Sequence, residues 1–251
     1  MKYFSYITFA LLFFLISCSS AQKFNPFVKP KDEIYASIKT IALAPIGIPK
    51  DLPRQKELQQ YFESRITQKL ESFGFTVLSS DKYDKTYTAM IKSMGGLYDS
   101  MTGTINKEKY DAVIKHSLRQ MKAIHNADAV VFSSISVFNV DFSNSTAAWD
   151  GTSEGVENSS TIPGQIIGGL FGFRKTYSGK CPVLSLVVEL VDVFNNTQYY
   201  NRGGLQMISK IGAKGTFVNV PLNELLTDES VNAYSIKVAL DPLDKKTKKR
   251  K

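Results

Sequence analysis

The N-terminal segment constrains this chain most, because it has the features of a signal peptide that ends at a lipidated cysteine. A lone cation, Lys2, precedes an apolar run over residues 9–16, and the small residue Ser17 stands directly before Cys18. A cleavable secretory signal has the same three parts, a basic start, an apolar core and a small residue before the cut. A transmembrane anchor needs about 20 apolar residues, which this run does not supply. We therefore expect a signal peptide at 1–17, cleavage between Ser17 and Cys18, and lipidation of Cys18.

Acyl chains on Cys18, palmitate among them, would hold the mature protein at a membrane. Each buried methylene contributes about 0.8 kcal/mol, and more than one chain makes such anchoring stable. Ser19, directly after the cysteine, resembles the residue found in lipoproteins that bacteria with two membranes sort to the outer membrane. We expect a lipid-anchored protein of the bacterial cell envelope, at the periplasmic face of the outer membrane.

Cys181 is the only other cysteine, so a chain lipidated at Cys18 forms no intramolecular disulfide even in an oxidising periplasm. It precedes Pro182 and the apolar run at 183–188. Unpaired cysteine in such surroundings is usually a small buried hydrophobic residue. We expect Cys181 to be buried, with a free reactive thiol as the alternative.

The formal net charge of +8 is concentrated at the C-terminus, where residues 245–251 supply six cations and leave +2 for the rest. We expect 243–251 to be a solvated, disordered basic tail. Contact with anionic lipid headgroups or with the acidic face of a partner remains open. Basic residues are not interleaved with aromatic ones elsewhere, so no nucleic-acid partner is expected.

Apolar periodicity predicts alternating strands and helices in the first half. Leu58, Phe62, Ile66 and Leu70 recur every four residues, which places them on one face of a helix. The predicted order is a strand at 38–45, a helix at 54–73, a strand at 75–78, a weaker helix at 83–93 and a helix at 107–125.

The second half is rich in β-strand patterns. Strands are predicted at 129–142 and 183–193, and Asn195-Asn196 is a plausible hairpin turn into a strand that reaches residue 208. A final helix is predicted at 222–240, with Leu226, Val231, Tyr234 and Val238 buried. Helices combined with these strands predict a single α/β (α+β) domain over 36–242, a mixed β-sheet covered by helices, preceded by a lipidated linker at 18–35.

The connection at 143–180 is far longer than usual and is expected to be a hairpin-like insertion between two core strands. Such loops are commonly functional or disordered. It begins with a polar, turn-rich stretch and continues with an apolar, glycine-rich one that should be buried against something. The candidate interaction residues in this loop are Trp149, Asp150, Gly151, Ile166, Ile167, Leu170, Phe171 and Phe173.

Residue patterns for catalysis are missing from the sequence. His116 and His125 lie nine residues apart on one predicted helix, whereas helical metal pairs usually stand at i and i+4. No serine occupies a Gly-x-Ser-x-Gly elbow, and the glycines match neither a dinucleotide fingerprint nor a phosphate loop. We therefore expect no catalytic residue, no metal and no cofactor. An enzyme whose site is not visible in sequence remains an alternative.

Two strand sequences, Asn126–Ser133 and Leu184–Thr197, resemble core strands of the periplasmic lipoproteins related to the curli secretion channel CsgG, the penicillin-binding-protein activator LpoB and the amino-terminal domain of TolB. The strand at 38–45, the following helix and the strand at 75–78 match in order and spacing. The resemblance covers roughly residues 36–242. It implies an α/β domain with a helix-covered mixed sheet.

The resemblance implies two roles. In channel members the long connection and the segment after the second strand become transmembrane hairpins of an oligomeric pore. Here charged residues interrupt the lipid-facing alternation that a membrane strand needs. We therefore expect a non-enzymatic, lipid-anchored binding or assembly factor that contacts an envelope protein or a second copy of itself, with a curli-type secretion-channel subunit as the alternative. The interrupting charges are Asp150, Glu154, Glu157, Arg174 and Lys175.

Overall fold

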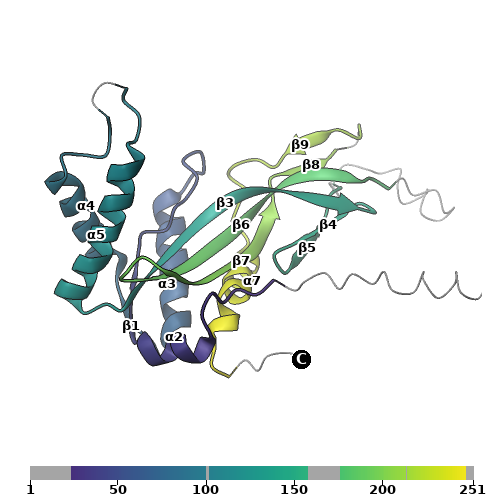
Figure 1. Ribbon diagram of the computed structural model, residues 1–251. Coiled ribbons are helices and arrows are strands. Elements are labelled where there is room, and N and C mark those ends of the chain that lie inside the picture. The colour runs from purple at the N-terminus through teal and green to yellow at the C-terminus, as the bar shows by residue number, and fades with distance from the viewer. Residues whose placement is uncertain (1–23, 100–101, 158–175, 213, 247–251) are drawn as a thin grey trace, which may run out of the picture.

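The computed structural model describes residues 24–99, 102–157, 176–212 and 214–246 (Figure 1). The helices are α2 (Lys31–Ser37), α3 (Gln55–Ser72), α4 (Ser80–Ser93), α5 (Lys107–His125), α7 (Glu229–Leu240) and the short 3-10 helix η1 (Asp241–Leu243). The strands are β1 (Thr40–Leu43), β2 (Thr76–Leu78), β3 (Ala129–Ser143), β4 (Thr146–Trp149), β5 (Thr152–Gly155), β6 (Gly179–Asp192), β7 (Thr197–Met207), β8 (Ser209–Ile211) and β9 (Phe217–Asn219). This arrangement confirms the predicted α/β class.

The main sheet is mixed because it contains both parallel and antiparallel strand pairs. β1 pairs in parallel with β2 and with β3, through helical crossovers. β3 then runs antiparallel to β6 from Ala129↔Asp192 to Phe142↔Gly179, and β6 pairs antiparallel with β7. The far end of β3 also pairs with β4, and β4 pairs with β5. The described start of the insertion therefore forms a hairpin between two core strands, as predicted.

Each face of the sheet is covered by different elements (Figure 1). One face carries α2, α3 and α7 and holds the largest apolar cluster. The opposite face carries α4 and α5 over β1 and the start of β3. At the far end of that face, the β4–β5 hairpin forms a third cluster with β6, β7 and β8. The long strands therefore pack against two separate layers on this face, helices α4 and α5 at one end and the β4–β5 hairpin at the other.

The folded part is longer than the predicted span of 36–242. Helix α2 lies in the predicted linker, yet Ile34 and Tyr35 are 0% and 7% exposed. The Tyr35 hydroxyl donates to the carbonyl of Leu243, which is itself fully buried, at 2.8 Å. A helix of seven residues is too short to show a periodic stripe, so only its packing reveals it.

Helix α7 begins later than predicted, because Asp228 caps it by accepting hydrogen bonds from the backbone of Ser230 and Val231. Tyr234 was expected in the core but is 47% exposed. The helix instead turns Ser235 and Ala239 toward the sheet. Small residues on this face allow α7 to approach β7 closely, which the apolar pattern does not indicate.

A candidate interaction site on the open sheet face

Strand β3 is long enough that its two covers leave a strip of the sheet open between them. Its even-numbered residues face the side that carries α4 and α5, as the packing of Val130 in that cluster shows. Further along the same face, Phe132, Ser134 and Ser136 are only partly buried. The hydroxyls of Ser134 and Ser136 lie 3.1 Å apart. This strip is a partly exposed surface of the sheet, with serine hydroxyls on it, between α5 and the β4–β5 hairpin.

A hollow of about 500 Å³ opens at the α5 side of this strip. Its residues come from one helix, three strands and one turn, and they belong to three separate parts of the sequence. They combine aromatic and aliphatic side chains with carboxylates, an amide and a hydroxyl. The lining residues are Tyr110, Asp111, Ile114, Phe132, Glu189, Val191, Asn195 and Thr197.

The two carboxylates of the hollow are held in different ways. Glu189 accepts a hydrogen bond from the Thr197 hydroxyl at 2.5 Å across the β6–β7 pair. Asp111 forms an ion pair with Lys107 one helical turn earlier, at 2.6 Å between Oδ2 and Nζ. That pair is exposed and contributes little to stability. The hollow thus presents acceptors whose positions are set by the sheet on one side and the helix on the other.

Phe132, which lines the hollow, packs against aromatic rings of α4. The ring of Tyr83 packs edge-on against Phe132 at 5.5 Å and stacks on Tyr87 at 5.9 Å. Burial raises the pKa of Tyr83 well above its usual value, with Tyr87 and Tyr110 adding to the shift. The Tyr83 hydroxyl is buried with no hydrogen-bond partner among the described residues. The phenol therefore stays neutral and serves as packing.

The outer edge of β3 is open between the two covers. Ile135 donates its backbone N–H to Gly47 at 2.8 Å, and Phe142 pairs with β4. Between them, residues 136–141 have no ladder partner on this edge within the described chain. Asn139 lies opposite Pro182 on β6. The Pro182 carbonyl accepts from the backbone N–H of Ile208, and the Pro182 nitrogen has no hydrogen. Asn139 and Pro182 therefore share no backbone hydrogen bond, and the backbone N–H and carbonyl of Asn139 point to the open edge.

Three of the predicted interaction residues, Trp149, Asp150 and Gly151, form the turn that fastens the β4–β5 hairpin to the sheet. The Trp149 indole is 6% exposed and donates to the carbonyl of Leu184 at 3.2 Å. Asp150 pairs with Arg202 at 3.1 Å. Trp149 and the Asp150 carboxylate are therefore engaged in contacts within the fold, whereas Gly151 is exposed.

Asp150 also accepts a hydrogen bond from the Ser185 hydroxyl at 2.7 Å. The Arg202 guanidinium lies 4.5 Å from the centre of the Phe138 ring. Gly204 allows the hairpin turn to lie close to β7, because a Cβ there would lie 2.8 Å from the carbonyl oxygen of Trp149. A larger residue at this position would lift the hairpin from β7.

The other predicted site residues divide between a buried thiol and residues beyond the described chain. Cys181 is fully buried, and burial raises the pKa of its thiol, with the Glu154 carboxylate adding to the shift. Ser17 and Cys18, and the apolar part of the predicted loop, lie outside the described residues. That apolar part comprises Ile166, Ile167, Leu170, Phe171 and Phe173.

Two structural features bear on metals and membranes. Within the described residues, no three His, Cys, Asp or Glu side chains gather into a potential metal site. None of the helices described is long and apolar enough to cross a membrane.

The sequence reasoning missed the hollow, although one signal was present. Glu189 interrupts an otherwise apolar strand at 183–193. A charged residue within a buried strand indicates that one face is open at that point. Tyr110, in the first turn of α5, is 40% exposed and lines the hollow.

Comparisons with known proteins give distant structural similarity only. No protein-family model matches the sequence, and no curated protein matches it. A PelC dodecamer from Paraburkholderia phytofirmans aligns with a TM-score of 0.36 and 14% identity, over 83% of this chain and 89% of that chain. Lipoprotein GNA1162 from Neisseria meningitidis aligns with a TM-score of 0.32 and 14% identity, over 77% and 96% of the two chains.

A homolog of neuraminyllactose-binding hemagglutinin from Helicobacter pylori aligns with a TM-score of 0.33 and 14% identity, over 88% of this chain and 89% of that chain. Similarity at this level carries no argument about what this chain does. Membership of the superfamily of CsgG, LpoB and TolB stays a prediction.

Proposed function

We propose that this protein is a lipid-anchored, non-enzymatic binding factor of the bacterial cell envelope, which captures an extended segment of a partner protein along β3. The observation that carries the proposal is the edge at 136–141, which has no pairing strand among the described residues and lies beside a partly exposed strip of the same sheet. Exposed strand edges are templates for pairing with another chain. Strand addition to such an edge is a common mode of peptide recognition.

The length and chemistry of this edge support a peptide partner. Six residues of β-strand extend about 20 Å, enough for main-chain hydrogen bonds to provide affinity. Val137 is 54% exposed on this segment and offers an apolar contact. Nearer α5, Glu189 and Asp111 line the hollow on one face of the sheet, and their carboxylates would favour basic or hydroxyl-bearing side chains of a partner that reaches it.

A site-specific crosslinking experiment tests the edge. A photo-reactive residue at Val137 in the full, lipidated chain should give a discrete adduct in its host envelope. The same residue at Ile124, which is 64% exposed on α5, serves as the matched control and should give none. Adducts of equal yield at both positions, or at neither, would refute capture along β3.

A proline variant links the adduct to backbone pairing. Because the N–H of Asn139 faces the open edge, Asn139→Pro removes a donor that the fold does not use. Asn139→Ala retains that donor. The proline variant should lose the Val137 adduct while the alanine variant keeps it, with both melting near the parent temperature. An unchanged adduct in a folded Asn139→Pro protein would contradict the proposal.

The anchor and the oligomeric state are tested separately. Replacement of Cys18 by serine should release the protein from membranes into the soluble periplasmic fraction. Imaging of the detergent-extracted parent distinguishes the adaptor from the alternative. Monomers or small oligomers support a binding factor, whereas closed rings would favour a secretion-channel subunit.

A further inference from the structure

The two ends of the described chain lie against one another at the edge of β7 that does not pair with β6. We call residues 24–33 and 241–246 the terminal surface. Phe27 forms a β-bridge with Tyr199 and packs edge-on against its ring at 5.2 Å. The Lys31 ammonium donates to the carbonyl of Asp244 at 2.6 Å. The segment that leads from the anchor and the segment that leads to the basic tail are therefore fixed side by side.

Helix α2 fixes the start of the tail as well. Lys245 places its ammonium 4.2 Å from the centre of the Tyr35 ring, and Lys246 donates its backbone N–H to Asp244 at 2.9 Å. The direction in which the chain leaves Leu243 is thus set by the fold. The basic tail begins at a defined place rather than at a random point of the surface.

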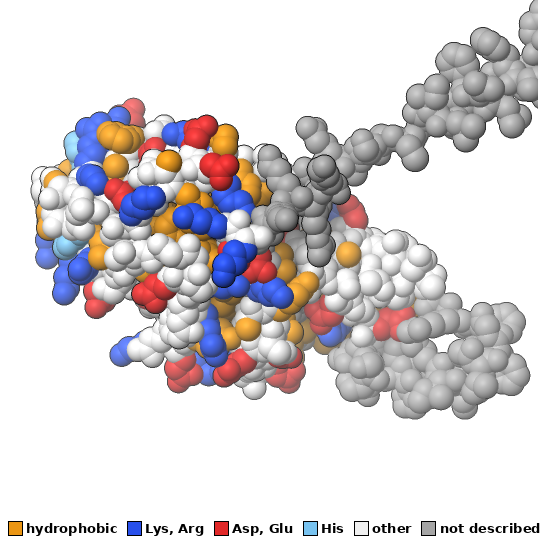
Figure 2. Space-filling view, turned by 90° about the horizontal axis from the view of Figure 1, so that it is seen from below, with side chains coloured by type: hydrophobic (Ala, Val, Ile, Leu, Met, Phe, Trp, Pro, Cys, Tyr) orange, Lys and Arg blue, Asp and Glu red, His pale blue; other side chains and the backbone are white. Residues whose placement is uncertain are grey.

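The terminal surface combines cations with exposed apolar side chains. Phe24 and Val28 are 63% and 66% exposed. Figure 2 shows this end of the molecule from below, with blue and orange side chains across its middle. The described cations are Lys29, Lys31, Lys245 and Lys246, and the described acidic residues are Asp32, Glu33, Asp241 and Asp244. Four further cations follow Lys246 in the sequence with no acidic residue among them, so the balance is positive.

The membrane is within reach of this surface if Cys18 carries the anchor. Cys18 is six residues before Phe24, and six extended residues span at most about 20 Å. We propose that the terminal surface lies on an anionic membrane, with Lys245 and Lys246 on lipid phosphates and with Phe24 and Val28 at the headgroup boundary. This inference rests on the proposed anchor. The electrostatic contact is a second attachment beside the lipid anchor. It orients the domain with its α2 end on the membrane and with β3 directed away from the membrane.

Vesicle binding by the unlipidated chain tests the inference. The mature chain with Cys18→Ser is mixed with vesicles of phosphatidylcholine alone or with about one third phosphatidylglycerol. Each cation near such a surface contributes roughly fivefold in affinity. The double variant Lys245→Gln with Lys246→Gln should therefore bind anionic vesicles roughly 25-fold more weakly than the parent chain. Binding of the parent should weaken as salt is raised.

A matched control removes two charges elsewhere. Lys115→Gln with Arg119→Gln changes exposed cations of α5, away from the terminal surface, and should leave vesicle binding unchanged. Equal weakening in both double variants would show a general charge effect and overturn the inference. So would a parent chain that binds neither vesicle or both equally. A lipidated chain that stays on membranes while its Cys18→Ser form ignores anionic vesicles overturns only this inference and leaves the anchor standing.

Discussion

Replacement of Gly203 by alanine tests how the fold holds α7 against the sheet. Gly203 lies in β7, where the backbone of α7 passes directly over it. A Cβ at this position would lie 2.0 Å from the carbonyl oxygen of Ser235 and 2.8 Å from its carbonyl carbon. Both are backbone atoms of a helix, so no side-chain rotation relieves the clash. The helix has to move away from β7 or the strand has to bend.

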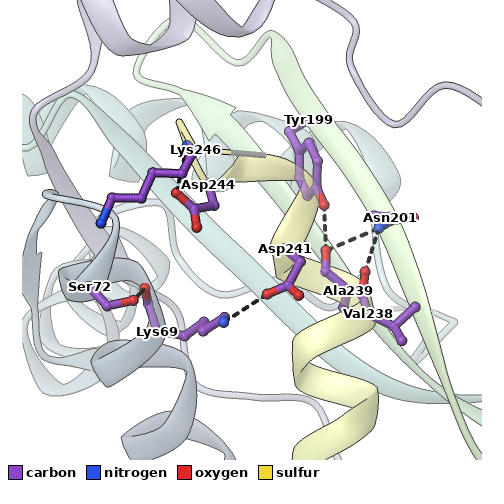
Figure 3. Close-up of polar contacts among 9 residues, drawn as sticks. All are labelled: Lys69, Ser72, Tyr199, Asn201, Val238, Ala239, Asp241, Asp244 and Lys246. Atoms are coloured by element: carbon purple, nitrogen blue, oxygen red, sulfur yellow. Dashed lines mark hydrogen bonds and ion pairs between the residues drawn. The ribbon is translucent and has the colours of Figure 1, made fainter. Parts of the chain in front are cut away.

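The expected cost follows from what that movement breaks. Ser235 donates its hydroxyl to the Gly203 carbonyl at 2.8 Å. The Tyr199 hydroxyl donates to Ala239, and the Asn201 amide donates to Val238 at 3.0 Å (Figure 3). Overpacking costs about 1–3 kcal/mol, and each buried hydrogen bond that is lost adds about 1 kcal/mol. We expect a loss of about 4 kcal/mol in the free energy of unfolding.

Thermal and urea melts of the unlipidated mature chain measure this loss. In a chain of this size, 1 kcal/mol lowers the melting temperature by about 2–4 °C, so the expected drop is about 8–16 °C. Gly155→Ala is the matched control, since its Cβ would meet nothing closer than the Ser145 carbonyl oxygen at 4.0 Å. It should change the free energy by less than about 0.5 kcal/mol. A loss below about 1 kcal/mol for Gly203→Ala, or an equal loss in both variants, would refute the close-approach argument.

Two further substitutions test single buried groups by the same melts. Tyr83→Phe removes a buried hydroxyl with no partner among the described residues and should leave stability equal or higher. Tyr199→Phe loses the hydrogen bond from its hydroxyl to α7 and should cost about 1–3 kcal/mol. A larger loss for Tyr83→Phe than for Tyr199→Phe would contradict this reasoning. Burial alone would raise the pKa of Asp128, but hydrogen bonds from Lys122 and from two backbone amides lower it. Its stabilisation is therefore present above the unfolded pKa of about 3.9 and is lost as pH falls through the lower folded value. Asp128→Asn should cost about 1.5–3 kcal/mol at pH 7 and much less below the folded pKa, whereas a pH-independent difference would exclude the mechanism.

Several elements followed from the sequence because their signals are local. Helix α5 spans Lys107–His125 as predicted, since Asn106 caps its start by accepting from Lys109 and Asn126 ends it in the left-handed conformation. The apolar stripe of α3 and the long strands β3 and β6 also lie where periodicity and β-branched residues place them. The charge of the tail is a property of composition alone.

Other features depend on contacts between distant residues and leave no local pattern. Helix α2 is defined by the burial of Ile34 and Tyr35 against residues far along the chain. Trp149 is buried because Gly204 lets the hairpin turn approach β7. The candidate site shows the same dependence, since its hollow exists only where α5, β3, β6 and β7 converge.

The sequence by itself predicted a signal with a lipidation site, and it determined an alternation of helices and strands and an insertion between two core strands. Those properties depend on spacings of a few residues, which one chain segment carries alone. Only the tertiary structure decided that the turn of the β4–β5 hairpin is fastened to the sheet, that no described strand pairs with the outer edge of β3 at 136–141, and that the two ends of the described chain lie together. These depend on which surfaces remain uncovered after packing, and uncovered surface is a property of the assembled layers.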